Sequence, residues 1–445
     1  MLSLFIRVTL KSVTHSLVLN LLPHVRSRFA IVNYLAIKAM ATPTQVFKCD
    51  PESISFSGDE PIYSDPETEN AIRSAVQHLT ERRVVAFPTE TVYGLGALAL
   101  DVSAATKIFS TKGRPSDNPL IVHISSLSML NSLLPPSYIP SPAYKTLMRA
   151  FWPGPLTLLF PADPSCVPPI ITAGHPTVAV RMPAHPVARA LIATTGTPLA
   201  APSANASGKP SPTRAAHVLR DLGSTGRLPL LLDGGPCAVG LESTVVDGLG
   251  EDGALRVLRP GGATVEALSA ALEDLDVKDG SLRPRVLVHR RDFVLENHEV
   301  NAPTTPGMKY RHYAPAVPVT LLYTSTTPTE IDGDGGGGLM QCVGIDAFFG
   351  EVERGTSGRL GLMAQDDSPL LARARCEGPR WVTFSLGGSA EPACAAQRLF
   401  EGLLSLEEQG VERIFVQEVA EEREGLAFMN RIRKAAGTSL RIVDI

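Results

Sequence analysis

Four cationic side chains of this 445-residue sequence stand where an apolar or helical segment ends. Lys112 and Arg114 close a predicted helix and open the turn in "KGRPSDNPL". Arg181 ends the apolar run "TVAVR", and Arg259 ends the run "ALRVLR". Ligands of open α/β sheets bind at the carboxyl ends of strands, and clustered cations favour phosphates and carboxylates. These positions therefore predict a pocket for an anionic small molecule.

Hydroxyl, amide and imidazole side chains occupy comparable positions at strand ends and turns. They are Thr91, Asn118, His123, Ser203, Asn205, Ser211 and Ser243. Each has a structural alternative: cations at a helix end stabilise the helix dipole, and a histidine on an apolar strand is often a core residue. A ligand site is favoured because so many of these side chains occur in one part of the chain.

Common catalytic motifs are missing from the sequence. It contains no P-loop, no GxGxxG after a strand, no HExxH and no GxSxG. The six cysteines are scattered without a CxxC pair, which argues against a zinc site and a disulfide framework. We therefore predict neither a metal centre held by side chains nor a protein nucleophile.

The pattern of apolar segments predicts two α/β domains. Between residues 66 and 262, strand-like runs and helical stretches favour a twisted sheet of mixed strand direction covered by helices. Hydrophobic periodicity weakens over 263–315, which we interpret as a linker. Strands and helices alternate again over 316–445 and predict a smaller, Rossmann-like domain. Residues 1–65 are expected to form an extension before the folded part.

The N-terminal extension resembles a targeting segment. The first acidic residue is Asp50, and basic residues precede it among Ser, Leu and Val, as in a mitochondrial transit peptide. Alternatively, translation starts at Met40. Pro23, Arg26 and Arg28 interrupt the apolar run before the roughly 20 residues that a membrane span needs. We expect a cytoplasmic protein without a membrane segment, with a mitochondrial form if the extension is translated.

Six ordered segments resemble the motifs of the YrdC-like family. They are "PTETVYGLG" (88–96), "KGRPSDNPL" (112–120), "VRMPAHP" (180–186), "PSANASGKPSPT" (202–213), "ESTVVD" (242–247) and "LRPG" (258–261). "TPGMKYRHYAP" (305–315) is similar to the interdomain motif of the two-domain branch, the threonylcarbamoyl-AMP synthases. It begins with Thr305 where serine is expected. The resemblance covers the chain from about residue 66 to the C-terminus.

The resemblance implies a specific reaction. L-threonine, bicarbonate and ATP would give L-threonylcarbamoyladenylate and pyrophosphate, with Mg²⁺ on the phosphates. The product would pass to a tRNA threonylcarbamoyl transferase complex that modifies adenosine 37 of tRNAs reading ANN codons. The enzyme would meet RNA directly or through that complex.

The resemblance also implies roles for individual residues. L-threonine would contact Thr91, His123, Arg181, the backbone of Ala201, and Ser243. ATP would contact Arg114, Asn118, Thr177, Ser203, Asn205, Ser211 and Arg259. Lys112 and Arg114 would be catalytic, facing the triphosphate and a carbamate. In the linker, Tyr310, Arg311 and His312 would lie over the site as a lid.

The predicted cations suit this chemistry. Both the carbamate and the triphosphate are anionic, so cations and oriented donors can bring them together without a protein nucleophile. One alternative is a module that binds tRNA or double-stranded RNA without turnover. The net charge of −4 and the lack of a basic stripe argue against it. A related carbamoyl transferase of hydrogenase maturation is disfavoured, since those proteins carry zinc-finger-like cysteine pairs.

Overall fold

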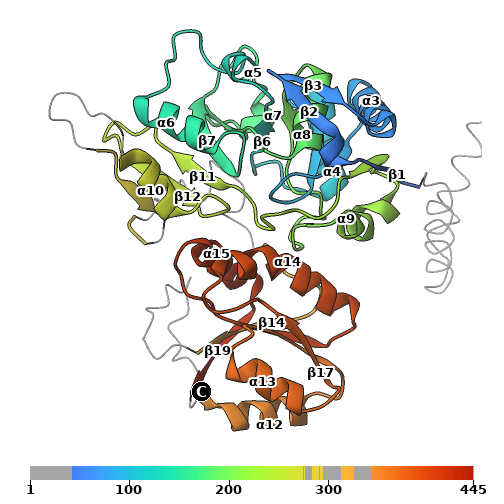
Figure 1. The fold of residues 1–445 in the computed structure, drawn as a ribbon, viewed down its shortest axis with the longest axis vertical. Helices are drawn as coiled ribbons and strands as arrows, with labels where there is room; N and C mark the ends of the chain where they lie inside the picture. Colours follow the sequence, from blue (N-terminus) through green and yellow to red (C-terminus); the bar gives the residue numbers. More distant parts are fainter. Residues whose placement is uncertain are drawn as a thin grey trace, which may run out of the picture.

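The computed structural model describes residues 43–273, 275, 283–289, 291–293, 312–324 and 342–443. These residues form two α/β units, stacked along the long axis of the molecule (Figure 1). Tyr310 and Arg311 of the predicted lid lie outside the described residues, as do residues 1–42.

An eleven-stranded sheet forms the N-terminal unit. Its strands, in spatial order, are β1 (Gln45–Lys48), β10 (Leu230–Asp233), β4 (Val85–Phe87), β5 (Gly94–Leu98), β9 (Leu199–Ala200), β6 (Ile121–His123), β8 (Thr177–Arg181), β7 (Leu156–Pro161), β11 (Thr244–Asp247), β12 (Leu255–Arg259) and β13 (Val286–Val288). The β6–β8 and β7–β11 pairs are parallel, whereas β7–β8 and β11–β12 are antiparallel. The predicted mixed sheet is therefore confirmed.

Two hydrophobic cores cover this sheet. On one side, α3 (Pro66–Thr80) and α8 (Pro186–Thr195) pack on Val85 and Phe87 of β4. Ala86 instead joins the core of α4 (Val102–Lys112), α6 (Pro142–Phe151), α9 (Ala215–Leu222) and α10 (Val265–Glu273). Successive strand side chains point to opposite faces, which explains the division. The short helices are α5 (Leu127–Asn131), α7 (Pro169–Thr172), η2 (Pro51–Ser53) and η3 (Gly223–Thr225).

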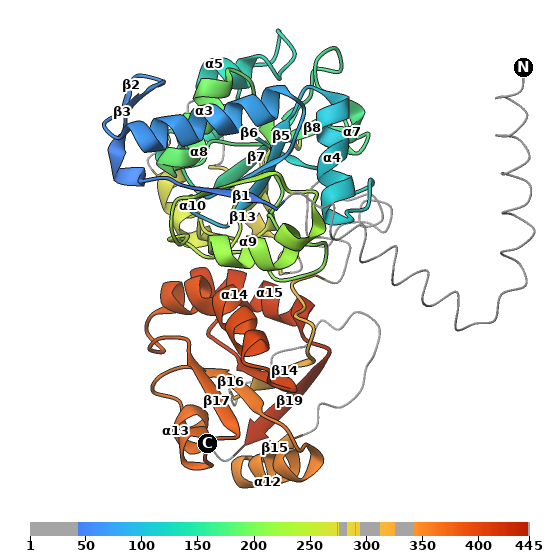
Figure 2. The same cartoon turned by 90° about the vertical axis from the view of Figure 1, so that its right-hand side faces the viewer.

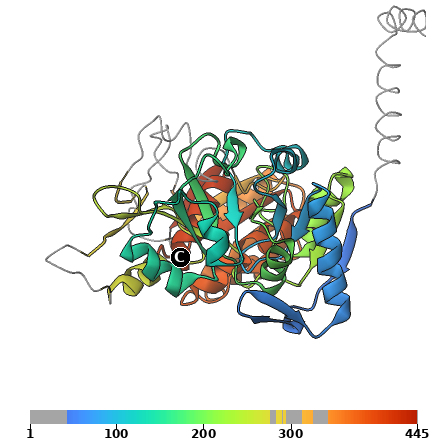
Figure 3. The ribbon, with the colours of Figure 1, turned by 90° about the horizontal axis from the view of Figure 1, so that it is seen from above.

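The N-terminal unit begins earlier than the predicted boundary at residue 66. Strand β1 pairs in parallel with β10 at the edge of the sheet, which lies at the blue end of the unit in Figure 3. A hairpin of β2 (Ile54–Ser57) and β3 (Glu60–Tyr63) follows. Phe56 and Tyr63 pack against the core of α3 and α8. The polar, turn-rich composition of this segment concealed these short strands, whose few apolar residues give little periodicity.

The N-terminal unit also extends past the predicted boundary at residue 262. Helix α10 buries Leu268 and Leu272 and packs against α6. Strand β13 then adds to the sheet in parallel with β12. Residues 265–273 and 286–288 therefore contribute to the core, because their apolar side chains fall on one helical face and one short strand.

The C-terminal unit is a six-stranded parallel sheet. Its order is β15 (Cys342–Gly344), β19 (Thr438–Val443), β14 (Val319–Tyr323), β18 (Arg413–Gln417), β16 (Leu360–Ala364) and β17 (Trp381–Ser385). Helices α12 (Ile345–Gly355) and α13 (Pro369–Cys376) join one core, and α14 (Pro392–Glu408) and α15 (Glu424–Ala435) join another. This confirms the Rossmann-like α/β prediction. No helix in the described ranges is both long and apolar enough to cross a bilayer.

Helices α14 and α15 lie between the two sheets and face the N-terminal unit (Figure 2). Arg214, which precedes α9, pairs with Glu401 at 2.6 Å between Nη2 and Oε1. Arg220 of α9 lies 3.2 Å from Glu407 and 3.1 Å from Glu408. Exposed ion pairs contribute little free energy singly. Their concentration on one helix nevertheless fixes how α14 lies against α9.

Candidate active site

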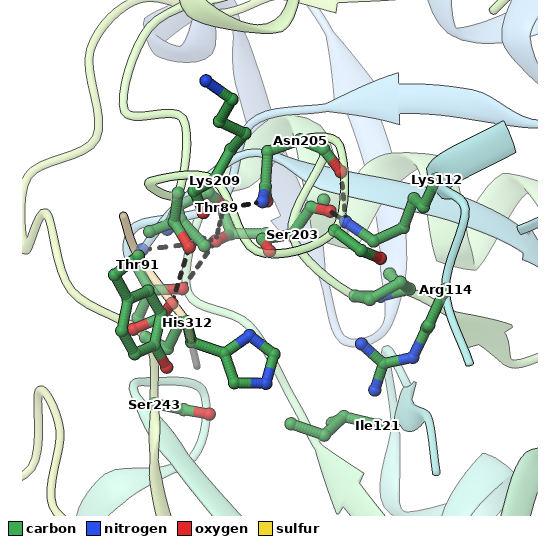
Figure 4. Close-up of a pocket in the computed structure, with 18 of the residues that line it drawn as sticks. Thr89, Thr91, Lys112, Arg114, Ile121, Ser203, Asn205, Lys209, Ser243 and His312 are labelled. Carbon is green, nitrogen blue, oxygen red and sulfur yellow. Dashed lines mark hydrogen bonds between the residues drawn. The ribbon is translucent and has the colours of Figure 1, made fainter. Parts of the chain in front are cut away.

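A pocket opens in the N-terminal unit beside the end of α4, the ends of β6 and β8, and the loops that follow β9 and precede β11. Its lining includes most of the predicted site residues: Thr91, Lys112, Arg114, His123, Arg181, Ala201, Ser203, Asn205, Ser211, Ser243, Arg259 and His312. Figure 4 shows Lys112 and Arg114 on one side, with Thr91 and Ser243 across from them. The structure thus brings together side chains that span most of the domain sequence.

Two described residues of the predicted ATP site do not line this pocket. Thr177 begins β8, while Arg181 ends it at the pocket, so the two are about 13 Å apart along the strand. Asn118 is buried beside the pocket, and its main-chain carbonyl accepts a hydrogen bond from Arg114 Nε at 3.1 Å. Thr177 lies at the start of β8, beside the Asn118–Pro119 segment that Arg114 contacts, because Ile121 of β6 pairs with Ala179 of β8.

Lys112 holds the loop that follows β9. Helix α4 ends at Gly113, whose φ of 64° provides the left-handed cap that directs the chain into the following turn. The Lys112 ammonium donates to the main-chain carbonyls of Ser203 and, at 2.5 Å, of Asn205. Burial, followed by the charge of Arg114, lowers the pKa of Lys112 well below its ordinary value. Lys112 therefore fixes the main chain of the loop that carries Ser203 and Asn205.

Arg114 is positioned by the turn that follows it. Its Nη2 donates to the carbonyl of Pro119 at 2.7 Å, in addition to its bond with Asn118. Burial lowers the pKa of Arg114 to about 10, and the charge of Arg259 contributes next. Arg114 stays cationic at neutral pH. The guanidinium groups of Arg114 and Arg259 repel one another, and an anionic ligand beside them would reduce this repulsion.

Arg181 forms a hydrogen-bonded group with the loop after β4. Its Nη1 donates to Thr91 Oγ1 at 2.8 Å, and its Nη2 lies 2.6 Å from Glu90 Oε1. Thr89 Oγ1 donates to the Val92 carbonyl at 2.6 Å, so the Thr91 hydroxyl must donate to Thr89 across 2.8 Å. The network fixes the rotamer of Thr91 and the direction of the Arg181 guanidinium.

His123 is a neutral hydrogen-bond acceptor. Its Nδ1 lies 3.1 Å from the carbonyl of Ile121, which can only accept, so Nδ1 carries the proton. Burial, with a contribution from Arg181, lowers the pKa of His123 to about 3. The lone pair of Nε2 is therefore available at neutral pH to a ligand amine or hydroxyl.

Ser243 and Arg259 are hydrogen-bonded to one another on the side of the pocket next to β11 and β12. Arg259 Nη2 donates to the Ser243 carbonyl at 2.9 Å and to Ser243 Oγ at 3.2 Å. Thr157 Oγ1 lies 2.7 Å from Ser243 Oγ. These contacts join the start of β11 to the end of β12, so the hydroxyl and the cation act as one unit.

Sequence reasoning missed three ionisable residues that line the pocket: Lys209, Glu242 and Tyr313. Glu242 opens the "ESTVVD" motif and Lys209 lies within "PSANASGKPSPT", so their motif positions could have pointed to them. Tyr313 follows His312, has a φ of 69°, and stacks 5.3 Å from Phe400 of α14. Only the fold reveals that Tyr313 links the pocket to the C-terminal unit.

The lining of the pocket is predominantly cationic. Within the described ranges it includes Lys112, Arg114, Arg181, Lys209 and Arg259, and Glu242 supplies a carboxylate. The described residues hold no group of three or more His, Cys, Asp or Glu side chains that could bind a metal ion. The arrangement can bind a ligand with separated anionic groups and orient them for reaction.

Three buried histidines predict acid sensitivity. Burial is the main cause that lowers the pKa of His123 to about 3, and those of His217 and His312 to about 4. The unfolded chain binds protons near pH 6.5, so stability is fully present above that value and declines as pH falls toward 4. We expect each histidine to remove about 1 kcal/mol of unfolding free energy between pH 6.5 and 5.5.

Urea unfolding across this pH range, by wild type and His217→Gln, measures the effect. His217 does not line the pocket, so it can be changed separately from the site. The variant should show a shallower decline of unfolding free energy below pH 6.5. Equal slopes for the two proteins would contradict the assignment.

Family models match the chain in two consecutive parts. Residues 77–261 match the model described as "Telomere recombination", and 263–437 match "Threonylcarbamoyl-AMP synthase, C-terminal domain". A threonylcarbamoyl-AMP synthase of Bacillus subtilis is 42% identical over 379 residues, covering 85% of this chain and 95% of that protein. The chain belongs to the threonylcarbamoyl-AMP synthase family. A Schizosaccharomyces pombe member is 40% identical over 402 residues, covering 83% and 89% of the two chains.

Solved structures of this family share the two-unit architecture. Sua5 of P. abyssi, in a crystal structure with L-threonine, is 34% identical to this chain with a TM-score of 0.66. The alignment covers 89% of this chain and 99% of that one. The threonylcarbamoyl-AMP synthase relatives favour an enzyme over the alternative of an RNA-binding module without turnover.

Proposed function

We propose that this protein converts L-threonine, bicarbonate and ATP into L-threonylcarbamoyladenylate and pyrophosphate. One observation carries the proposal: a single pocket joins Arg181, Thr91 and His123 to Arg114 and Arg259. It occurs in a chain that belongs to the threonylcarbamoyl-AMP synthase family. The two groups of side chains suit two different anionic substrates.

The group around Arg181 suits threonine. The Arg181 guanidinium can pair with the amino-acid carboxylate. Nε2 of neutral His123 can accept a hydrogen bond from the amine or the side-chain hydroxyl. Ser243 and the main chain of Ala201 complete this side of the pocket. A site that pairs with the substrate hydroxyl discriminates strongly against amino acids that lack one.

The group around Arg114 and Arg259 suits the triphosphate, and Ser203 adds a hydroxyl donor. The threonine amine would attack the carbon of bicarbonate, and water would leave as the carbamate forms. A carbamate oxygen would then attack the α-phosphorus, and pyrophosphate would leave. The cations lower the barrier by holding two anions together and stabilising the developing charge.

Mg²⁺ and the downstream partner belong to the same proposal. The metal would enter with ATP, bound to its phosphates, and would balance charge on the pyrophosphate. The adenylate would then be consumed by a tRNA threonylcarbamoyl transferase complex acting on adenosine 37 of tRNAs that read ANN codons.

Pyrophosphate release tests the proposal. Protein expressed from Met40, which keeps every described residue, is incubated with ATP and Mg²⁺, and threonine and bicarbonate are omitted in turn. We expect release that requires both, and formation of the adenylate by mass spectrometry. Release without either would instead indicate an ATP pyrophosphohydrolase. No release, together with tight and steeply salt-dependent tRNA binding, would favour the RNA-binding alternative.

A further inference from the structure

Arg431 extends from the C-terminal unit to the wall of the pocket. It belongs to α15 and is fully buried, with a relative exposure of 0%. Its Nε donates to Glu242 Oε2 at 3.1 Å, and its Nη1 donates to the main-chain carbonyl of Pro260. The predicted site residues, by contrast, lie in the N-terminal unit or the linker.

Glu242 connects Arg431 to the pocket, because it contacts Arg431 and lines the pocket. Its second oxygen, Oε1, accepts a hydrogen bond from Ser211 Oγ at 2.6 Å, and both side chains line the pocket. Burial opposes the ionisation of Glu242. The guanidinium groups of Arg431 and Arg259 and the Ser211 hydroxyl outweigh it, so its pKa lies below the ordinary value. Glu242 is therefore a carboxylate whose charge is balanced mainly by Arg431.

Arg431 also fixes the segment that carries Arg259. Pro260 directly follows Arg259, and the Gly262 amide donates to the Glu242 carbonyl at 3.2 Å. One guanidinium thus bridges the residue before the 243–259 hairpin and the residue after it. Holding both ends sets the direction in which Arg259 enters the pocket.

Because Glu242 is negatively charged, its pairing with Arg431 affects how well the pocket can bind an anion. A buried carboxylate that loses its partner repels nearby anions and attracts the nearest remaining cation. Arg259 is the other guanidinium that acts on Glu242. Without Arg431, Glu242 would draw Arg259 away from a bound phosphate.

We propose that Arg431 is a positioning residue for ATP, which makes the C-terminal unit part of the active site. It does not contact the substrate. It neutralises Glu242 and holds the Pro260 carbonyl, and thereby keeps Arg259 directed at the polyphosphate and Ser211 hydrogen-bonded in the pocket wall. This inference rests on the proposed function.

Arg431→Leu should raise the apparent KM for ATP more than it changes the KM for threonine. Loss of charge-assisted hydrogen bonds of this kind corresponds to a rise of roughly 10- to 100-fold. The KM for threonine should rise less, because Arg181 and His123 do not contact this clamp and only Ser243 of the threonine group is linked to it, through Arg259. Steady-state adenylate formation, with each substrate varied in turn, gives both values.

A double variant separates charge balance from simple docking. In Arg431→Leu/Glu242→Gln the unpaired carboxylate is gone, so the KM for ATP should fall back by about tenfold from the single variant. Arg214→Leu is the matched control, because it breaks the ion pair with Glu401 between the same two units without a contact to the pocket. Its KM values should equal those of wild type.

A folded Arg431→Leu with the wild-type KM for ATP would overturn the inference. A double variant whose KM for ATP is no lower than that of Arg431→Leu would overturn it as well.

If Arg431→Leu does not fold, Arg431→Lys keeps the charge but replaces the planar guanidinium by one ammonium. It should raise the KM for ATP by several-fold, and an unchanged KM would overturn the inference. Failure of wild type to form adenylate would refute the proposed function instead. ATP binding by calorimetry would then still test the clamp.

Discussion

Arg181→Ala is expected to lower kcat/KM for adenylate formation by roughly 100- to 1,000-fold while the protein stays folded. Removing one partner of a buried, hydrogen-bonded charge pair typically costs about 2–5 kcal/mol. Arg181 is buried and contacts Thr91 and Glu90, so its loss removes the cation for the substrate carboxylate. The unpaired Glu90 carboxylate would then add repulsion at the same place.

Adenylate formation and circular dichroism of the purified variant check this result. Arg149→Ala is a suitable control, because Arg149 is an exposed cation on α6 that does not line the pocket. It should retain wild-type kcat/KM. If folded Arg181→Ala also retained wild-type kcat/KM, Arg181 would have no role in binding threonine.

Gly261→Ala is expected to lower both stability and activity. A Cβ at this position would meet main-chain atoms of Glu242 and Ser243, and would lie 2.5 Å from the amide nitrogen of Thr244. Main chain cannot move aside as a flexible side chain can. We expect a loss of about 3 kcal/mol in unfolding free energy. Activity should fall by more than about tenfold, because Ser243 and Arg259 would be displaced.

Gly253→Ala provides the comparison for this substitution. Gly253 lies between β11 and β12 with a φ of 66°, but an added Cβ would meet open space. Only the left-handed backbone should matter, at about 1 kcal/mol, and activity should be preserved. Urea unfolding and kcat/KM distinguish the two variants. Equal behaviour of both would show that the close approach at Gly261 is unimportant.

The positions of several site residues could be predicted because they follow apolar runs. Arg181 and Arg259 end strands whose limits are visible in the sequence, and the structure places both at the pocket. Gly113 was correctly expected to end the helix before Arg114. The start of this helix is less clear from sequence: Ser103 and Asp101 could each cap it, and the structure shows that Asp101 accepts from the Ala104 amide.

Short apolar runs were less informative. The run "QCVGIDAF" could form one strand by its composition, but β15 ends at Gly344 and α12 begins at Ile345. Runs of this length do not separate a strand from a buried helix by periodicity. The β16 strand was missed for a similar reason, since Gly361 interrupts its apolar pattern.

Contacts between distant segments could not be predicted from one sequence. Arg431 and Glu242 are 189 positions apart. In its own segment, Arg431 is a basic residue on a helix and Glu242 is an acidic residue in a loop, and neither neighbourhood indicates a distant partner. Their pairing depends on how α15 lies against the loop before β11. The contact of Thr177 with ATP stays a prediction: β8 places Thr177 beside the Asn118–Pro119 segment that Arg114 contacts.

The edge strand β1 limits how many N-terminal residues can be removed without disturbing the sheet. Thr44 Oγ1 donates to the Leu228 carbonyl at 2.7 Å, and β1 then pairs with β10 through Lys48. Initiation at Met40, or proteolytic maturation before Thr44, leaves this strand in place. Cleavage beyond Lys48 would uncover the backbone donors and acceptors of β10, and an uncovered strand edge recruits other chains. Maturation downstream of β1 would therefore make the protein prone to aggregation through the exposed edge of β10.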